Sequence, residues 1–376
     1  YAAALGFGYT AMTLPTDDGD ENQVLKTDGS GALSWTTPSS GGASAIDDLS
    51  DAKSAGTNFT GSLIIGNQTT GTLDNASYNT AVGLVSLNAI TTGDNNTAVG
   101  WGTLSANTTG SLNTASGYGA LNSNTGGDRN IAIGSNAYDA ADLEDDNLAI
   151  GYDALGGNIN GGEQNVAIGN YSLDANTSGG YNVAVGYNSL SANTTGGSNT
   201  AIGLGALQDN IGGALNDAHG VYSLGDNTTG DYNVALGSSS LRFTTTADGN
   251  TAIGYTALRE ANRTADTDGF NTALGYNAGN TNTNDITTGN KNTLLGASTA
   301  ASAAAGTNQS VIGYGASGQA DNSVTLGNAD VTAVYMAQDK GATVYTAGIS
   351  LANDETITNS TDGTVLINGT VAGGTG

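Results

Sequence analysis

The chain has 376 residues, of which 34 are acidic and 8 basic, giving a formal net charge of −26. It contains no cysteine, which excludes disulfides and thiolate metal sites, and its charge has the wrong sign for binding a nucleic-acid backbone. No apolar run approaches the ~18 residues that span a bilayer, so we expect no membrane insertion. The 59 glycines and the abundance of Asn, Thr and Ser disfavour long helices and favour an all-β chain.

The start of the chain predicts two small modules before any repeat. Residues 1–12 are apolar and are expected to form a lead strand. Residues 13–45 are typical of a β-hairpin module followed by a Ser/Gly linker, with Asp28 and Gly29 at the hairpin turn.

A five-residue motif, Asn-Thr-Ala-Val/Ile-Gly, recurs through residues 46–327. Of the fifteen intervals between its glycines, eleven are 17 residues, one is 18, two are 21 and one is 14. A disordered tract would not keep this frame. The motif glycines are Gly66, Gly83, Gly100, Gly117, Gly134, Gly151, Gly169, Gly186, Gly203, Gly220, Gly237, Gly254, Gly275, Gly296, Gly313 and Gly327.

Each repeat unit has a short predicted strand and a second apolar anchor. The residues one and three positions before the glycine are mostly apolar or Thr, which predicts a strand with one buried face. We expect the residue directly before the glycine, such as Ile202, to point into the core. Leu207 is an example of the anchor four residues after the glycine, and Asn199 of an asparagine four residues before it. Stacked copies of this asparagine would form a ladder of hydrogen-bonded amides.

A unit of this size cannot bury its own anchors and must stack on copies of itself. The predicted fold is therefore a parallel β-solenoid, or β-roll, of about 17-residue coils, with Phe59 capping the first coil. A coil this thin leaves apolar faces uncovered. We expect an elongated homotrimer, because three rolls can close a common apolar axis.

Two longer intervals between motif glycines and the end of the chain do not follow the 17-residue spacing. The insertions at Asn262–Gly269 and Asn280–Gly289 are expected to be surface loops, which in solenoids often form the binding face. Residues 328–376 are expected to form a C-terminal β-rich segment. Its predicted strands are Val331–Tyr335, Thr343–Tyr345 and Thr364–Ile367.

The repeat motif resembles that of a known class of fibres. Asn199–Leu207, which reads Asn-Thr-Ala-Ile-Gly-Leu-Gly-Ala-Leu, is similar to the repeat of trimeric phage tail fibre shafts and of trimeric autotransporter adhesin heads. Asn22–Trp35 is similar to a module found near the start of fibre shafts. The adhesin heads use a shorter unit, near the 14-residue step seen only from Gly313 to Gly327. The resemblance covers roughly residues 13–345 and implies a trimeric shaft with a host-receptor-binding surface on a virion tail or a cell surface.

Few residues could support catalysis. A catalytic triad would have to use His219, the single histidine, whose side chain we expect inside the roll as a polar core residue. Copies of His219 that meet at a trimer axis could instead bind a metal or an anion. No catalytic residue and no cofactor is expected.

An acidic turn is the second candidate for metal binding. Asp142, Glu144, Asp145 and Asp146 could bind Ca²⁺ through crowded carboxylates, but a solvated acidic turn is the preferred interpretation. Their spacing matches no EF-hand loop.

Tyrosines that follow the motif glycines are expected to form a stripe along the coils. Such a stripe can pack between protomers or stack on sugars. Its members are Tyr118, Tyr152, Tyr187, Tyr255, Tyr276 and Tyr314.

The sequence thus predicts a non-enzymatic structural fibre whose partners are copies of itself and a cell-surface glycan or other host receptor. A phage tail fibre in the virion tail is the first interpretation. The alternative is a microbial cell-surface adhesin or a self-assembled extracellular filament. A carbohydrate-degrading β-helix is disfavoured, because this sequence shows no paired carboxylates arranged in a cleft. An ice-binding solenoid is disfavoured as well, because the array of Thr residues along the repeats is interrupted.

Overall fold

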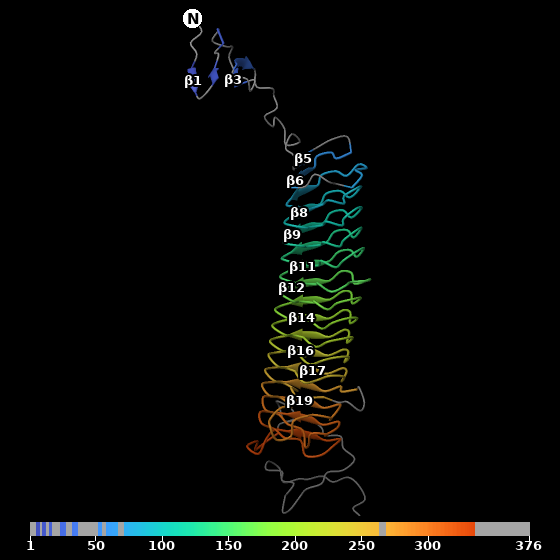
Figure 1. Cartoon of the computed structure of the whole chain (residues 1–376). Coiled ribbons are helices and arrows are strands. Elements are labelled where there is room, and N and C mark those ends of the chain that lie inside the picture. The colour runs from blue at the N-terminus through green and yellow to red at the C-terminus, as the bar shows by residue number, and fades with distance from the viewer. Residues whose placement is uncertain are drawn as a thin grey trace, which may run out of the picture. The chain divides into compact units, whose positions relative to one another are not determined.

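The computed structural model describes residues 5–7, 10–12, 15–16, 23–27, 32–36, 52–54, 58–66, 71–262 and 268–334. Within these ranges the chain is all-β, and it contains no helix that could cross a membrane. The chain divides into two compact units, Tyr1–Asp330 and Val331–Gly376. The first unit contains a parallel β-solenoid of about fifteen turns, as the repeat frame predicts (Figure 1).

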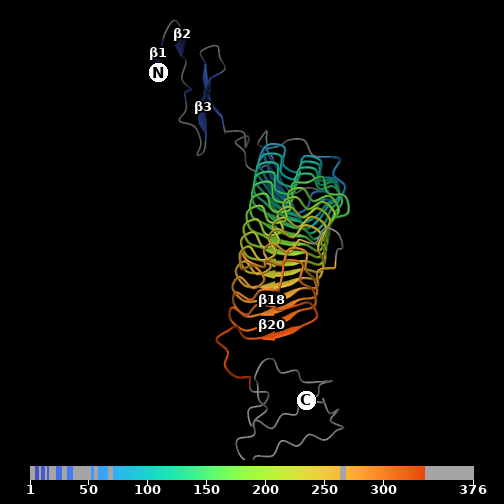
Figure 2. The same cartoon turned by 90° about the horizontal axis from the view of Figure 1, so that it is seen from below.

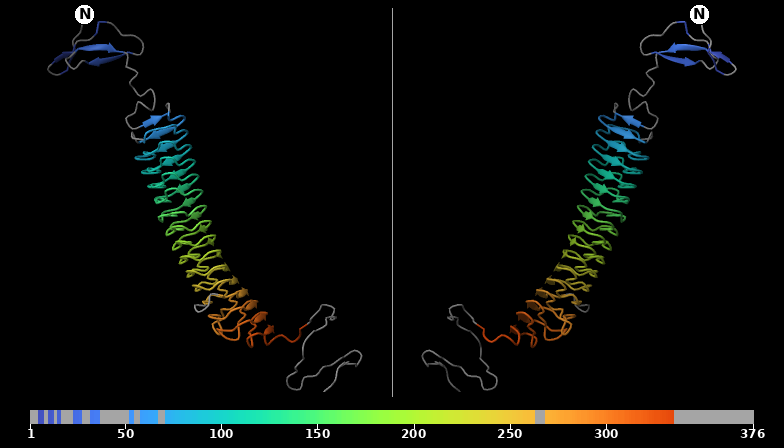
Figure 3. Two further views of the ribbon diagram at one scale, coloured as in Figure 1. Left: turned by 90° about the vertical axis from the view of Figure 1, so that its right-hand side faces the viewer. Right: turned by 90° about the vertical axis from the view of Figure 1, so that its left-hand side faces the viewer.

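Each coil of the solenoid contributes one three-residue strand to a single column (Figures 1, 2 and 3). From β6 to β21 each strand pairs in parallel with the next, so that Ala201 of β14 lies beside Ala218 of β15. Strand β5 pairs antiparallel with β6. The strands are β5 Ala52–Ser54, β6 Leu63–Ile65, β7 Thr80–Val82, β8 Thr97–Val99, β9 Thr114–Ser116, β10 Ile131–Ile133, β11 Leu148–Ile150, β12 Val166–Ile168, β13 Val183–Val185, β14 Thr200–Ile202, β15 Asp217–His219, β16 Val234–Leu236, β17 Thr251–Ile253, β18 Thr272–Leu274, β19 Thr293–Leu295, β20 Ser310–Ile312 and β21 Val324–Leu326.

Two small antiparallel sheets precede the solenoid. Strand β1 (Leu5–Phe7) pairs with β2 (Thr10–Met12), so the expected lead strand is a two-stranded element instead. Strand β3 (Val24–Thr27) pairs with β4 (Leu33–Thr36), which is the expected hairpin. The predicted turn itself, Asp28 and Gly29, lies outside the described residues.

The buried face of the strands is the opposite of the one expected. In β14 the middle residue, Ala201, is fully buried, whereas Ile202 is 39% exposed and points outward. The same pattern places His219 on the outer surface and Ala218 in the core. The prediction that the residue before each glycine faces the core is therefore wrong.

The narrow interior explains this arrangement. The leucine anchors, such as Leu207 and Leu224, are fully buried and fill the space opposite the strand. Only a methyl group fits between the strand and these leucines, because protein interiors are close-packed. The larger β-branched residues must then occupy the outward side of the strand.

The asparagine ladder is confirmed, and it lies inside the coil. The Asn199 amide nitrogen donates to Oδ1 of Asn182 at 3.2 Å and to the Gly213 carbonyl at 2.9 Å. In turn, Oδ1 of Asn199 accepts from the backbone N–H of Asn216 at 3.0 Å. The buried members are Asn79, Asn96, Asn113, Asn130, Asn147, Asn165, Asn182, Asn199, Asn216, Asn233, Asn250, Asn271 and Asn292.

A second asparagine ladder stands seven residues after the motif glycine. The Asn193 amide donates to Oδ1 of Asn176 at 3.0 Å, and the Asn210 amide to Oδ1 of Asn193 at 2.8 Å. The runs are Asn107 and Asn124, then Asn176, Asn193, Asn210 and Asn227. They end where the next coil carries Ala141 or Thr244. The buried Oδ1 atoms of Asn124 and Asn227, at those ends, accept no hydrogen bond within the described part of the chain.

Both ends of the frame show local adaptations. Phe59 is 1% exposed and covers the first coil, while the antiparallel strand β5 breaks the parallel edge. The insertion Asn280–Gly289 folds back through buried Ile286, so that it does not form a large free loop. Residues 263–267 of the other insertion lie outside the described residues.

The described start of the second unit contains no strand. The expected strand over Val331–Tyr335 is absent from Val331–Val334. The predicted strands Thr343–Tyr345 and Thr364–Ile367 lie outside the described residues.

Candidate interaction surfaces and polar sites

The first and third residues of strands β6–β21 form one continuous surface, which we call the outward sheet face. Except for Asp217 and His219, these positions hold only Val, Ile, Leu, Thr and Ser. In a chain with 34 acidic residues, this face has one carboxylate, and that carboxylate pairs with the only histidine. Depletion of charge around an apolar centre is typical of protein–protein interfaces.

The outward sheet face is large enough for stable association. Sixteen strands at a spacing of ~4.8 Å give a strip ~70 Å long, and a three-residue strand with its side chains is ~10 Å wide. The resulting area of roughly 700 Å² is close to the ~800 Å² that each partner buries in a standard interface. Val, Ile or Leu fills 21 of its 32 positions, so the strip is a largely apolar patch of the kind that marks an interaction site.

Asp217 and His219 are brought together on this face. His219 Nε2 lies 2.8 Å from Asp217 Oδ1, and the two side chains are 40% and 53% exposed. The shallow depression beside them is lined by Val234, Leu236 and Ile253. No hydroxyl or thiol side chain lines this depression.

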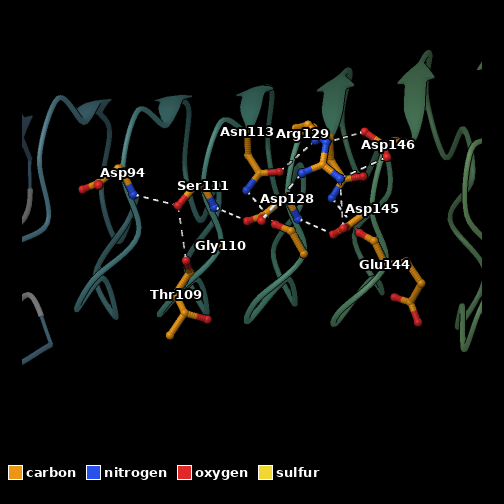
Figure 4. Close-up of polar contacts among 12 residues, drawn as sticks. Asp94, Thr109, Gly110, Ser111, Asn113, Asp128, Arg129, Glu144, Asp145 and Asp146 are labelled. Carbon is orange, nitrogen blue, oxygen red and sulfur yellow. Dashed lines mark hydrogen bonds and ion pairs between the residues drawn. The ribbon is translucent and has the colours of Figure 1, made fainter.

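Acidic residues elsewhere form a column along the coil corners (Figure 4). The Ser111 backbone N–H donates to Oδ1 of Asp128 at 2.7 Å, and the Asp128 N–H donates to Oδ1 of Asp145 at 2.7 Å. Ser77 and Asp94 form the same contact at 2.6 Å. These carboxylates therefore satisfy backbone donors between coils, as the Ser111 hydroxyl does for the Asp94 N–H at 3.0 Å.

Arg129 joins this column to two of the predicted metal candidates (Figure 4). Its Nε and Nη2 atoms contact both oxygens of Asp146, at 2.6 and 3.0 Å, and Nη2 also lies 3.0 Å from Asp145 Oδ2. The bonded guanidinium lowers the pKa of Asp146 below its usual value. Asp145 and Asp146 are thus occupied by a cation that the protein itself supplies.

The other two metal candidates also accept internal hydrogen bonds. Buried Glu144 accepts from the N–H groups of Asp142 and Leu143 at 3.1 and 3.2 Å, and from Gly161 at 3.0 Å. These bonds stabilise the turn beside the 18-residue coil. Asp142 accepts from the Thr125 hydroxyl. Within the described ranges, no group of three or more His, Asp or Glu residues has a geometry that could hold a metal ion.

Tyr187 of the expected stripe lines a groove together with Tyr171, which was not among the expected members. Tyr171 contacts Tyr152 and Tyr187 edge-on, with ring centroids 5.4 and 5.9 Å apart. Between Tyr171 and Tyr187 lies an open groove of about 550 Å³, which also exposes Asp174, Asn188 and Ser191. We call this the tyrosine groove. Elsewhere the stripe is fragmentary, with stacked pairs Trp101–Tyr118 and Tyr255–Tyr276.

The carboxyl groups beside the tyrosine groove are held in an unfavourable environment. Partial burial, and then the neighbouring Asp153, raises the pKa of Asp174. The same two causes raise the pKa of Asp139. The groove therefore combines aromatic ring faces with acidic and neutral polar side chains.

Two features were not found from the sequence. A second open groove, of about 580 Å³, lies at the last coil and is lined by polar residues that include Ser317, Gln319 and Asn328. Arg259 lies over the Phe243 ring at 4.5 Å, and Arg242 lies over Tyr222 at 4.7 Å. The repeat frame could have revealed these arginines, since Arg242 and Arg259 are 17 residues apart.

No protein-family model matches this chain, and a comparison with curated proteins finds no significant match.

Proposed function

We propose that this chain is a non-enzymatic structural fibre, a homotrimeric shaft whose copies associate through the outward sheet face. The observation that carries this proposal is the nearly complete absence of charge from that face in a strongly acidic chain. A charged surface would keep copies apart, and an apolar strip exposed to water would be costly. Three copies that close around one axis bury the strip on every chain.

The test is the effect of a charge on this face. Ile202→Asp places a carboxylate from each copy at the shared axis, whereas Ile211→Asp places it on an exposed bend later in the same coil. We expect sedimentation equilibrium to give about three times 37.0 kDa for the native chain and for Ile211→Asp, and the monomer mass for Ile202→Asp.

A native chain that stays at 37.0 kDa at all accessible concentrations would contradict the proposal. Equal masses for the two variants would show that association uses another surface.

The shaft would carry a receptor-binding surface for a cell-surface glycan, with the tyrosine groove as the contact. Aromatic faces stack on sugar rings, while Asp174, Asn188 and Ser191 supply hydrogen-bonding groups. We propose a phage tail fibre in the virion tail; the alternative is a microbial surface adhesin or extracellular filament. Immunogold labelling of phage particles and of cell surfaces with an antibody to this chain separates the two.

Glycan binding in the tyrosine groove can be tested separately from self-association. The double substitution Tyr171→Ala/Tyr187→Ala should weaken binding to a glycan array by at least about tenfold, or 1.4 kcal/mol, because both stacking surfaces are lost. Tyr181→Ala/Tyr232→Ala removes two exposed rings outside the groove and serves as the control. Equal binding by both double variants would place the receptor contact elsewhere, for example at the polar groove of the last coil.

A further inference from the structure

The pair Asp217–His219 interrupts the outward sheet face at one level only. In register with it, β14 presents Thr200 and Ile202, and β16 presents Val234 and Leu236. None of these four neighbours can titrate. Asp217 is therefore the one charged group that faces His219 from any packed strand, at 2.8 Å.

The remaining outward residues are nearly the same in every coil, so they cannot define one axial alignment of two copies. Valine, isoleucine, leucine and threonine repeat at nearly every coil, so two copies that slide by one coil would still bring apolar groups together. A one-residue polar interruption is known to fix register in repetitive apolar interfaces, as a buried Asn does in coiled coils. Asp217 and His219 occupy the equivalent place here.

We propose that Asp217 and His219 form a polar lock, which sets the axial register between copies of this chain and strengthens their association on acidification. This inference rests on the self-association proposed above. Cyclic symmetry places identical residues of each copy at the same height, so each pair meets its equivalents. A copy shifted by one coil would instead press its Asp217–His219 pair against Ile202 or Leu236, which offer the pair no polar group from the other copy.

The pH dependence follows from the charges at the lock. Protonated His219 neutralises Asp217, so that the shared face carries no net charge. With His219 neutral, each copy brings one uncompensated carboxylate to the axis, and these repel. The assembled state therefore binds more protons than the separate chains, and association weakens as pH rises.

The first experiment measures association by sedimentation at about pH 5.5 and about pH 8, where histidine is the side chain that ordinarily changes charge. His219 is the single histidine of the chain. We expect the apparent dissociation constant of the native chain to rise at least about tenfold at the higher pH. Asp217→Val/His219→Leu makes this level match its neighbours, and its association should be independent of pH. An unchanged melting temperature of the variant confirms that it folds.

The second experiment reads register, using the absence of native cysteine. Chains with Ile202→Cys and chains with Leu236→Cys are mixed, assembled and oxidised. The two sites are two coils apart, ~10 Å along the axis, which exceeds the reach of a disulfide. On the native background we expect links only between identical sites, whereas on the Asp217→Val/His219→Leu background mixed links should appear.

The outcomes separate the two proposals. A native chain that is monomeric at both pH values overturns the self-association itself. An assembly whose pH dependence and cross-links are unchanged in the Asp217→Val/His219→Leu background overturns the lock and leaves self-association standing. Association that requires an added divalent metal, and is lost with chelator, would also overturn the lock, since it would make His219 a metal ligand.

Discussion

Replacing Ala201 with aspartate is expected to unfold the central coils, whereas the same charge at the adjacent Ile202 should leave the coils folded. Ala201 is fully buried between Ala184 and Ala218, and the narrow interior has neither space nor a partner for a carboxylate. An unpaired buried charge should lower the free energy of unfolding by about 4 kcal/mol or more. Ile202→Asp puts its charge on the outside of the strand.

Circular dichroism melting and amide hydrogen exchange over β13–β15 measure the difference. Melting should be compared at a concentration where both chains are monomeric, because Ile202→Asp is also expected to prevent association. Closely similar melting temperatures for Ala201→Asp and Ile202→Asp would contradict the assignment of the inward face.

The motif glycine is the second position with a large expected effect. Gly203 has φ +138°, and a Cβ atom there would lie 2.5 Å from the Gly220 carbonyl oxygen of the next coil. Because that neighbour is backbone, it cannot move without shifting the whole stack. Gly203→Ala should therefore cost about 3 kcal/mol or more, from strain and overpacking together.

Gly102→Ala is the matched control for this prediction. Gly102 also has positive φ, +67°, but an added Cβ would meet nothing within 4 Å. Its cost should be limited to the conformational strain, about 1 kcal/mol. If urea unfolding gave equal losses for the two alanine variants, close stacking of the glycines would not be the reason for their recurrence.

The coil architecture could be predicted because it depends on spacing. An interval of 17 residues, a leucine anchor and an asparagine at a fixed distance are all readable along the chain, and stacking follows from the inability of one unit to bury itself. The ladder through Asn199 and the anchor at Leu207 are found where this reasoning placed them.

The inward face could have been found by parity. Side chains alternate along a strand, so Asn199 and Ala201 share one face, while Thr200 and Ile202 share the other. A ladder of buried amides therefore requires buried alanines. Hydrophobicity alone favoured Ile202 over Ala201 as the inward residue, because a hydrophobicity argument takes no account of the narrow width of the coil.

The corners of the coil were less predictable. Ser198, Tyr222 and Leu207 all have φ between +51° and +59°, a conformation that non-glycine residues rarely adopt. The stack compensates for this strain, as where the Leu207 N–H donates to the Ser223 carbonyl at 3.0 Å. Such corners depend on contacts between coils, which a single unit of sequence does not display.

The acidic candidates show the same limitation. Asp145 and Asp146 are adjacent in sequence to Glu144 and resemble a cation-binding turn. Their partners, however, are Arg129 and the Asp128 backbone, one coil earlier. Contacts with the preceding coil, 17 residues earlier, therefore give these carboxylates a structural role in place of the metal binding that their sequence suggests.

Hydroxyl-radical footprinting of the unmodified chain tests most directly whether the outward sheet face is covered by other copies. Ile202 and Ile211 are 39% and 49% exposed in the single chain, and Leu236 and Leu215 are 47% and 51% exposed. These pairs should be oxidised to similar extents if the chain stays single. We predict that Ile202 and Leu236 are strongly protected relative to Ile211 and Leu215, and that the protection disappears on dilution to monomer. Similar oxidation within both pairs at every concentration would contradict the assembly of this shaft through its outward sheet face.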